Sequence, residues 1–159
     1  MKIFADTGFL VGLWCRRDGL HNAATDVWQY LRDQRLISGL SDVIVTNYVV
    51  VEAFKLIQSD SGCDKATDFW EQVTSECDIK WATKETVRKA IVDKLAFHRN
   101  SRTGEPPIGL VDAISIVFMD SAHIRGIISY DEGYDSFPFV NRIHDRDSVD
   151  RLEQSWYRF

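Results

Sequence analysis

The chain has 159 residues, of which 45% are hydrophobic and 27% are charged, a balance typical of one globular domain spanning residues 1–159. Its net charge of −5 argues against a protein that coats nucleic acid through bulk positive charge, although an acidic metal site would reverse the field locally. Three cysteines without a Cys-x-x-Cys pair argue against a disulfide framework or a zinc ribbon.

The same features favour a cytoplasmic protein with reduced thiols. No apolar run approaches the roughly 18 residues of a membrane span, and the first residues do not read as a signal peptide. We therefore expect neither secretion nor a membrane partner.

The first half of the chain alternates short apolar runs with amphipathic segments. In chain order we expect a strand at 2–5, a helix at 20–34, a strand at 42–47, and helices at 48–58 and 64–76.

The second half continues the alternation. We expect a strand at 78–83, a helix at 84–99, a loop at 100–109, a helix at 112–124, a strand at 126–130, an edge strand at 139–143 and a helical C-terminal tail at 145–159. Strands that alternate with helices predict an α/β fold, with a mainly parallel sheet covered on both faces. In such folds the functional site lies beyond the carboxyl ends of the strands.

Four acids stand where a structural residue would be expected. Asp6 separates two apolar runs, and a charge beside a core costs several kcal/mol unless it is paired or binds a metal. Glu52 interrupts an otherwise apolar helix, and Asp112 lies in the first turn of another. Asp131 closes a strand. All four are expected at the carboxyl edge of the sheet.

Each acid alone has a structural alternative. Asp6 could cap the helix that follows it, and Asp112 could interact with a helix dipole. Glu52 could be an exposed helix residue, and Asp131 could belong to a turn. Taken together, four carboxylates at one edge repel one another and require divalent cations.

Oxygen ligands in this number suit Mg²⁺ or Mn²⁺, and no His/Cys cluster suggests zinc. Magnesium held by carboxylates usually shares its coordination shell with phosphate oxygens. The chemistry that this arrangement supports is metal-assisted hydrolysis of a phosphodiester bond.

Four segments, "FADTGFLVGLWCRRDGLH", "TNYVVVEAFKLI", "LVDAISIVFM" and "ISYDEGYDSF", together resemble the PIN-domain family, most closely the VapC-type ribonuclease toxins of prokaryotic toxin–antitoxin pairs. The resemblance extends from Lys2 to about Ile143. The family's aspartate after the first strand matches Asp6, and the glutamate of its second motif matches Glu52. Its two later aspartates match Asp112 and Asp131.

The resemblance implies a three-layer α/β/α PIN-like fold and an endoribonuclease that uses Mg²⁺ or Mn²⁺ at these four residues. It also implies an RNA substrate, a homodimer, and an antitoxin whose Arg or Lys reaches the acids. Arg99 and Arg102, just before Asp112, are placed to bind RNA phosphates, the alternative being a solvated basic face.

Some residues depart from the family pattern. The hydroxyl that often precedes the third acid is replaced by Val111, which removes one expected hydrogen bond to Asp112, whereas Ser129 keeps the hydroxyl before Asp131. Asp18 and His21 are interpreted as structural, and Asp135 is left out of the ligand set. Two other functions stay open: a PIN-like RNA-processing nuclease without an antitoxin, and a non-catalytic RNA- or partner-binding module.

Overall fold

The computed structural model describes residues 1–95 and 107–156. In this part of the chain five short strands form one parallel sheet in the order β3-β2-β1-β4-β5. The strands are β1 (Ile3–Ala5), β2 (Val43–Thr46), β3 (Asp78–Lys80), β4 (Gly126–Ile128) and β5 (Asn141–Ile143). Every residue of β1, β2 and β4 is buried, as expected for the central strands of a parallel sheet covered on both faces.

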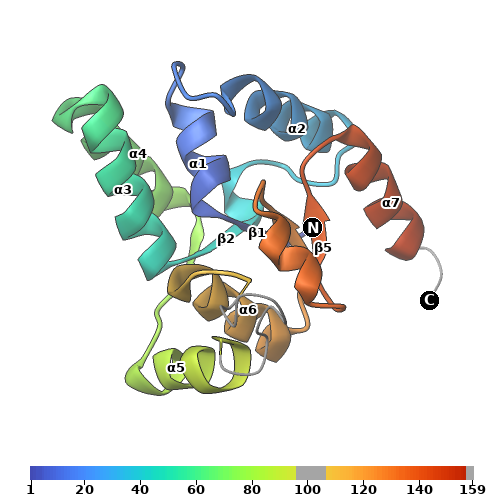
Figure 1. The fold of residues 1–159 in the computed structure, drawn as a ribbon. Coiled ribbons are helices and arrows are strands. Elements are labelled where there is room, and N and C mark those ends of the chain that lie inside the picture. The colour runs from blue at the N-terminus through green and yellow to red at the C-terminus, as the bar shows by residue number, and fades with distance from the viewer. Residues whose placement is uncertain (96–106, 157–159) are drawn as a thin grey trace.

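Helices cover both faces of this sheet (Figure 1). They are α1 (Thr7–Trp14), α2 (His21–Asp33), α3 (Asn47–Ser61), α4 (Cys63–Glu76), α5 (Lys84–Lys89), α6 (Leu110–Ala122) and α7 (Arg146–Trp156). In the view of Figure 1, α5 and α6 lie below the sheet, and α1, α2 and α7 lie on its other side.

Alternate strand residues divide the core between these two layers. Ile3 and Ala5 pack with side chains of α1 to α4 and α7, whereas Phe4 of the same strand packs with side chains of α6. The same alternation holds in β2, where Val43 and Ile44 belong to opposite sides. The expected three-layer α/β/α arrangement is thus present.

One helix was not among the expected elements. Helix α1 begins directly after Asp6 and is buried along most of its length, so its sequence lacks the polar stripe that marks an amphipathic helix. It packs closely against α2: a Cβ at Gly12 would lie 3.1 Å from Cβ of Ala24. This close approach fixes the helix whose first turn adjoins Asp6.

The remaining elements differ from expectation mainly at their ends. Helix α6 begins at Leu110, two residues earlier than expected, which places Asp112 at the third helical position. Helix α5 passes at Ala90 into a π-helical segment, and the end of the helix expected over 84–99 lies outside the described residues. None of the helices that the structure describes has the length and apolar character that a bilayer crossing requires.

Candidate active site

The four acids come from four different segments around the carboxyl ends of the central strands. Asp6 follows β1 and caps α1, and Asp131 lies three residues after β4. Glu52 lies in α3, which begins directly after β2, and Asp112 lies in the first turn of α6. Helix α3 contacts both α1 and α6, so the segments that carry these acids meet.

Asp6 is a buried carboxylate held by neutral donors. It is 6% exposed, and its Oδ1 accepts a hydrogen bond from the backbone N–H of Thr7 at 2.6 Å. Its Oδ2 accepts a hydrogen bond from the hydroxyl of Ser129 at 2.7 Å. The Ser129 oxygen in turn accepts the N–H of Asp131 at 3.0 Å. The capping role considered for Asp6 is therefore real, but a cap alone does not require this burial.

Asp112 is held in the same way. Its Oδ1 accepts a hydrogen bond from the phenol hydroxyl of Tyr134 at 3.0 Å, and its Oδ2 accepts the N–H of Gly109 at 3.1 Å. The hydroxyl that Val111 lacks is thus replaced by one from Tyr134. The sequence analysis missed Tyr134, whose only signal is that it follows Asp131 by three residues.

Glu52 is half-buried and bound to α1. The hydroxyl of Thr7 donates to its Oε2 at 2.6 Å. Thr7 therefore contacts two acids, Asp6 through its N–H and Glu52 through its hydroxyl. The sequence analysis missed this residue too, although its place next to Asp6 was visible.

Asp131 is the most exposed of the four acids. Its Oδ1 accepts the N–H of Gly133 at 2.7 Å and caps the short 3₁₀ helix η3 (Glu132–Ser136). The turn role considered for Asp131 is therefore present. Its carboxylate also lies close enough to Asp112 to raise the pKa of that group.

The pKa values of Asp6 and Asp112 indicate that no cation among the described residues compensates these two carboxylates. Burial, followed by the charge of Asp112, raises the pKa of Asp6 to about 7. Burial also raises the pKa of Asp112, with the charges of Asp131 and Glu52 adding to it against the hydrogen bonds from Tyr134 and Gly109. None of the ion pairs found within residues 1–95 and 107–156 includes any of these acids.

The donor set fits an open magnesium or manganese site. Within the described residues, no three His, Cys, Asp or Glu side chains come close enough to enclose one ion. Asp6 and Asp112 interact directly, and Glu52 and Asp131 act on Asp112 through their charges. Mg²⁺ is commonly bound through one or two carboxylates and keeps water molecules that phosphate oxygens replace. Asp6 and Asp112 suit such a site better than a closed cage of four ligands.

Three further residues from the sequence analysis have other contacts. Asp18 accepts the N–H of Leu20 within the segment between α1 and α2, and the His21 ring of α2 binds the carbonyl of Gly12 in α1. Asp135 is paired with Arg142 at 2.8 Å. Arg99 and Arg102 lie outside the described residues.

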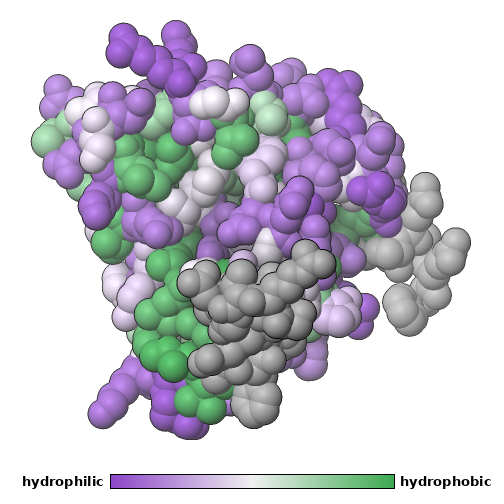
Figure 2. All heavy atoms as spheres, viewed as in Figure 1, coloured by the Kyte–Doolittle hydropathy of each residue, from purple (hydrophilic) through white to green (hydrophobic). Residues whose placement is uncertain are grey.

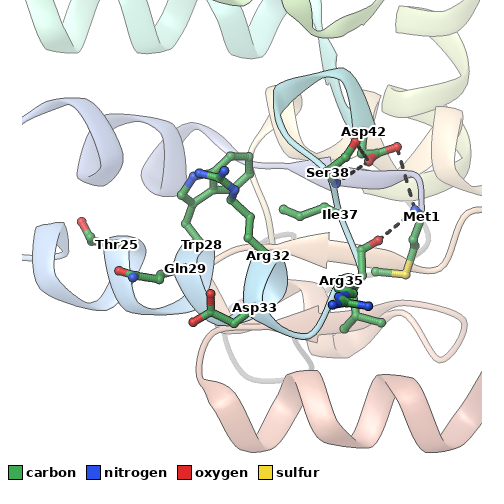
Figure 3. A pocket seen from close by; sticks show the side chains of 11 residues that line it. Met1, Thr25, Trp28, Gln29, Arg32, Asp33, Arg35, Ile37, Ser38 and Asp42 are labelled. Atoms are coloured by element: carbon green, nitrogen blue, oxygen red, sulfur yellow. Dashed lines mark hydrogen bonds and ion pairs between the residues drawn. The ribbon is translucent and has the colours of Figure 1, made fainter.

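The surface also contains two hollows away from these acids. One, of about 780 Å³, lies beside α2 and is lined by residues that include Trp28, Arg32 and Asp42 (Figure 3). The other, of about 680 Å³, lies between α2 and α4 and shares Trp28 and Arg32 with the first. Neither is lined by any of the four acids.

Comparison with solved structures finds this fold in the crystal structure of Mycobacterium tuberculosis VapC20, a toxin that cleaves the sarcin–ricin loop. The TM-score is 0.67, the alignment covers 86% of this chain and 95% of that chain, and 20% of the residues are identical. No model of a protein family matches the sequence, and no curated protein is significantly similar to it. At this identity the likeness establishes the fold, and the expected PIN-like fold is confirmed.

The raised pKa of Asp6 gives a testable pH dependence. In a metal-chelating buffer, the folded protein holds a proton on Asp6 between its ordinary pKa of 3.8 and its raised pKa of about 7, whereas the unfolded chain does not. The free energy of unfolding should therefore fall as the pH rises from 5 to 8. Asp6→Asn should remove this part of the slope, as measured by urea unfolding at each pH.

A matched control is Asp120→Asn, which changes an acid on α6 that pairs with Lys94 at the surface. This variant should keep the wild-type slope between pH 5 and 8. If Asp6→Asn and wild type showed the same slope, Asp6 would not be the uncompensated acid described above.

Proposed function

We propose that this chain is a metal-dependent endoribonuclease that hydrolyses RNA phosphodiester bonds and acts as the toxin of a toxin–antitoxin pair. The observation that supports this most is the group of four carboxylates held by N–H and hydroxyl donors without an ion-pair partner in the described residues. The PIN-like fold, shared with a toxin that cleaves RNA, supports the substrate class.

Asp6 and Asp112 would hold Mg²⁺ or Mn²⁺ directly, and Glu52 and Asp131 would bind the water molecules around it. A bound divalent ion lowers the pKa of a water molecule and neutralises charge on the phosphate. The chain's own residues keep the carboxylates in place: Thr7 fixes Glu52, Ser129 fixes Asp6 and Tyr134 fixes Asp112. Within the described residues Glu52 is bound through Oε2 alone, which leaves Oε1 to accept a proton from water.

The RNA strand needs positive charge near this acidic edge. Arg99 and Arg102 come shortly before α6 in the sequence, and we propose that they bind RNA phosphates beside Asp112. Arginine suits this role because its guanidinium forms paired hydrogen bonds to phosphate oxygens.

An RNA-processing nuclease without an antitoxin would use the same acids, so the site does not separate it from a toxin. The gene that neighbours this one discriminates the two: a toxin requires a small antitoxin gene. A non-catalytic binding module is less well supported, because it has no use for four carboxylates that repel one another.

The first functional prediction concerns the acids. Asp6→Asn and Asp112→Asn should each lower metal-dependent RNA cleavage by about 100-fold or more, because an amide cannot supply the charge that holds the cation. Cleavage of a labelled RNA with Mn²⁺ measures this, and circular dichroism checks that the fold is kept.

Asp120→Asn is again the control and should cleave at the wild-type rate. Wild-type cleavage by Asp6→Asn would reduce Asp6 to a helix cap. A wild-type protein that cut no RNA with Mg²⁺ or Mn²⁺ would favour the binding module instead.

The hollow between α2 and α4, called the groove from here on, is where we propose that an antitoxin binds. Trp14 and Trp28 line it. The ring centroid of Trp14 lies 5.1 Å from that of Phe69, and the ring centroid of Trp28 lies 6.2 Å from that of Phe9. Such anchored aromatic surfaces are typical of the centres of protein interfaces.

The charges of this groove indicate the chemistry of the partner. Arg16, Arg32 and Lys65 line it, and none of them takes part in an ion pair found among the described residues. The two tryptophans, together with three cations against the one acid Glu76 in the lining, fit an amphipathic helix with acidic residues. We propose that this helix anchors the antitoxin, and that an Arg or Lys elsewhere in the antitoxin reaches the acids in place of the metal.

Charge reversal tests the groove without disturbing the core. Arg16→Glu combined with Lys65→Glu should weaken binding of the small protein encoded beside this gene by about tenfold or more, measured by calorimetry. RNA cleavage should be unchanged. Lys84→Glu reverses one charge, that of an exposed lysine on α5 outside the groove, and is the control. Equal binding by the double variant and the control would exclude the groove.

We also propose that the chain forms a homodimer through α3 and α4. Tyr48, Val51 and Phe54 recur every third residue on α3, and Trp70 of α4 packs edge-on against Phe54 at 6.3 Å. Val51 is 60% exposed and Trp70 is 40% exposed, and Figure 2 shows apolar surface over this part of the molecule. Phe69, which precedes Trp70 on α4, is fully buried and belongs to the core.

Light scattering at micromolar concentration tests the dimer. The wild-type protein should scatter as twice its chain mass of 18.3 kDa, and Val51→Glu should scatter as a monomer because it places a charge on the apolar surface. Val92→Glu changes a residue that is 40% exposed near α5 and should stay dimeric. A wild-type mass of 18.3 kDa would contradict the proposal.

A further inference from the structure

Tyr134 is a core residue with one polar atom, and that atom reaches the acids. The side chain is fully buried and packs on the α6 side of the sheet. Its hydroxyl donates to Oδ1 of Asp112 at 3.0 Å. A buried phenol normally finds a hydrogen-bond partner, and here the partner is a carboxylate of the proposed metal site.

The backbone around Tyr134 is built for this contact. The N–H of Gly133 donates to Asp131, which closes the turn that begins η3. A Cβ at Gly133 would lie 2.3 Å from the carbonyl oxygen of Pro107 and 2.6 Å from Cγ2 of Ile108. Only glycine allows η3 to lie this close to the segment that leads into α6. Tyr134, the residue after Gly133, thereby reaches Asp112, which lies 22 residues earlier in the chain.

The hydroxyl does what a cationic side chain could not do. Asp112 is repelled by Asp131 and Glu52, and it also raises the pKa of Asp6. A lysine or arginine at this place would relieve the repulsion but would compete with a metal ion. A neutral donor holds one lone pair of Oδ1 and leaves the other available, while Gly109 does the same at Oδ2.

We infer that Tyr134 is a positioning residue, which holds the Asp112 carboxylate beside Asp6 in the orientation that accepts a divalent cation. This inference rests on the proposed function for the cation, but the contact between Tyr134 and Asp112 can be tested without it. Partners of this kind commonly change metal affinity by 10- to 100-fold when they are removed.

The chain offers a matched control in Tyr130. Its hydroxyl is also buried, but this oxygen has no hydrogen-bond partner among the described residues. Tyr134→Phe and Tyr130→Phe each remove one buried hydroxyl and keep the ring. Only the first removes a contact with an acid of the site.

Three measurements test the inference. By calorimetry, Tyr134→Phe should bind Mn²⁺ about tenfold more weakly than wild type, and Tyr130→Phe should bind within about twofold of it. In chelating buffer, Tyr134→Phe should lower the melting temperature when it is made in the wild-type protein. When it is made in Asp112→Ala, it should not lower the melting temperature, because the hydrogen bond to Asp112 is already absent there. In RNA cleavage, Tyr134→Phe should lower kcat and leave KM unchanged.

The outcomes separate the inference from the proposed function. Wild-type affinity for Mn²⁺ in Tyr134→Phe would overturn the inference, as would an equal loss of melting temperature in the wild-type and Asp112→Ala backgrounds. A merely structural tyrosine would give that second result. If wild type bound no Mn²⁺ but the two backgrounds still differed, the proposed metal function would be contradicted and the role of Tyr134 in holding Asp112 would stand.

Discussion

Mutual repulsion among Asp6, Glu52, Asp112 and Asp131 is the constraint around which this end of the molecule is organised. Burial and neighbouring charges raise the pKa of Asp6 to about 7, so the buried carboxylate is costly in the metal-free protein. The chain offsets this with hydrogen bonds from neutral groups. A structural ion pair would have offered a cation instead, and the ion pairs found in the described residues lie elsewhere. Under the proposed function, a bound divalent cation would remove this cost.

The parallel sheet makes it possible for the four acids to lie near one another. Because all strands run the same way, the segments that leave β1, β2 and β4 start from one edge. Helices α1 and α3 begin there, and their first N–H groups favour nearby negative charge. The tight packing of α1 on α2 at Gly12, and of η3 on Pro107 at Gly133, then fixes the distances between segments.

Sequence patterns predicted the layers and the position of the four acids near the carboxyl ends of the strands, because both depend on local features; the role of these acids as metal ligands stays a prediction. Apolar runs that end in a carboxylate are visible without a structure, as with Asp6 and Asp131. Helix α1 was missed because a helix that is buried all round shows no 3.6-residue stripe. The donors Thr7 and Tyr134 were also missed, since their contacts span 45 and 22 residues and depend on how helices approach one another. The placement of Arg99 and Arg102 stays a prediction.

We propose that Asp6 and Asp112 together bind a divalent cation, and anomalous diffraction from crystals grown with Mn²⁺ tests this. An anomalous peak is expected within coordination distance, about 2.2 Å, of a carboxylate oxygen of each residue, with water molecules between the ion and Glu52 or Asp131. Crystals that contain millimolar Mn²⁺ and show no peak between Asp6 and Asp112 would contradict the account, as would a lysine or arginine side chain found in that position.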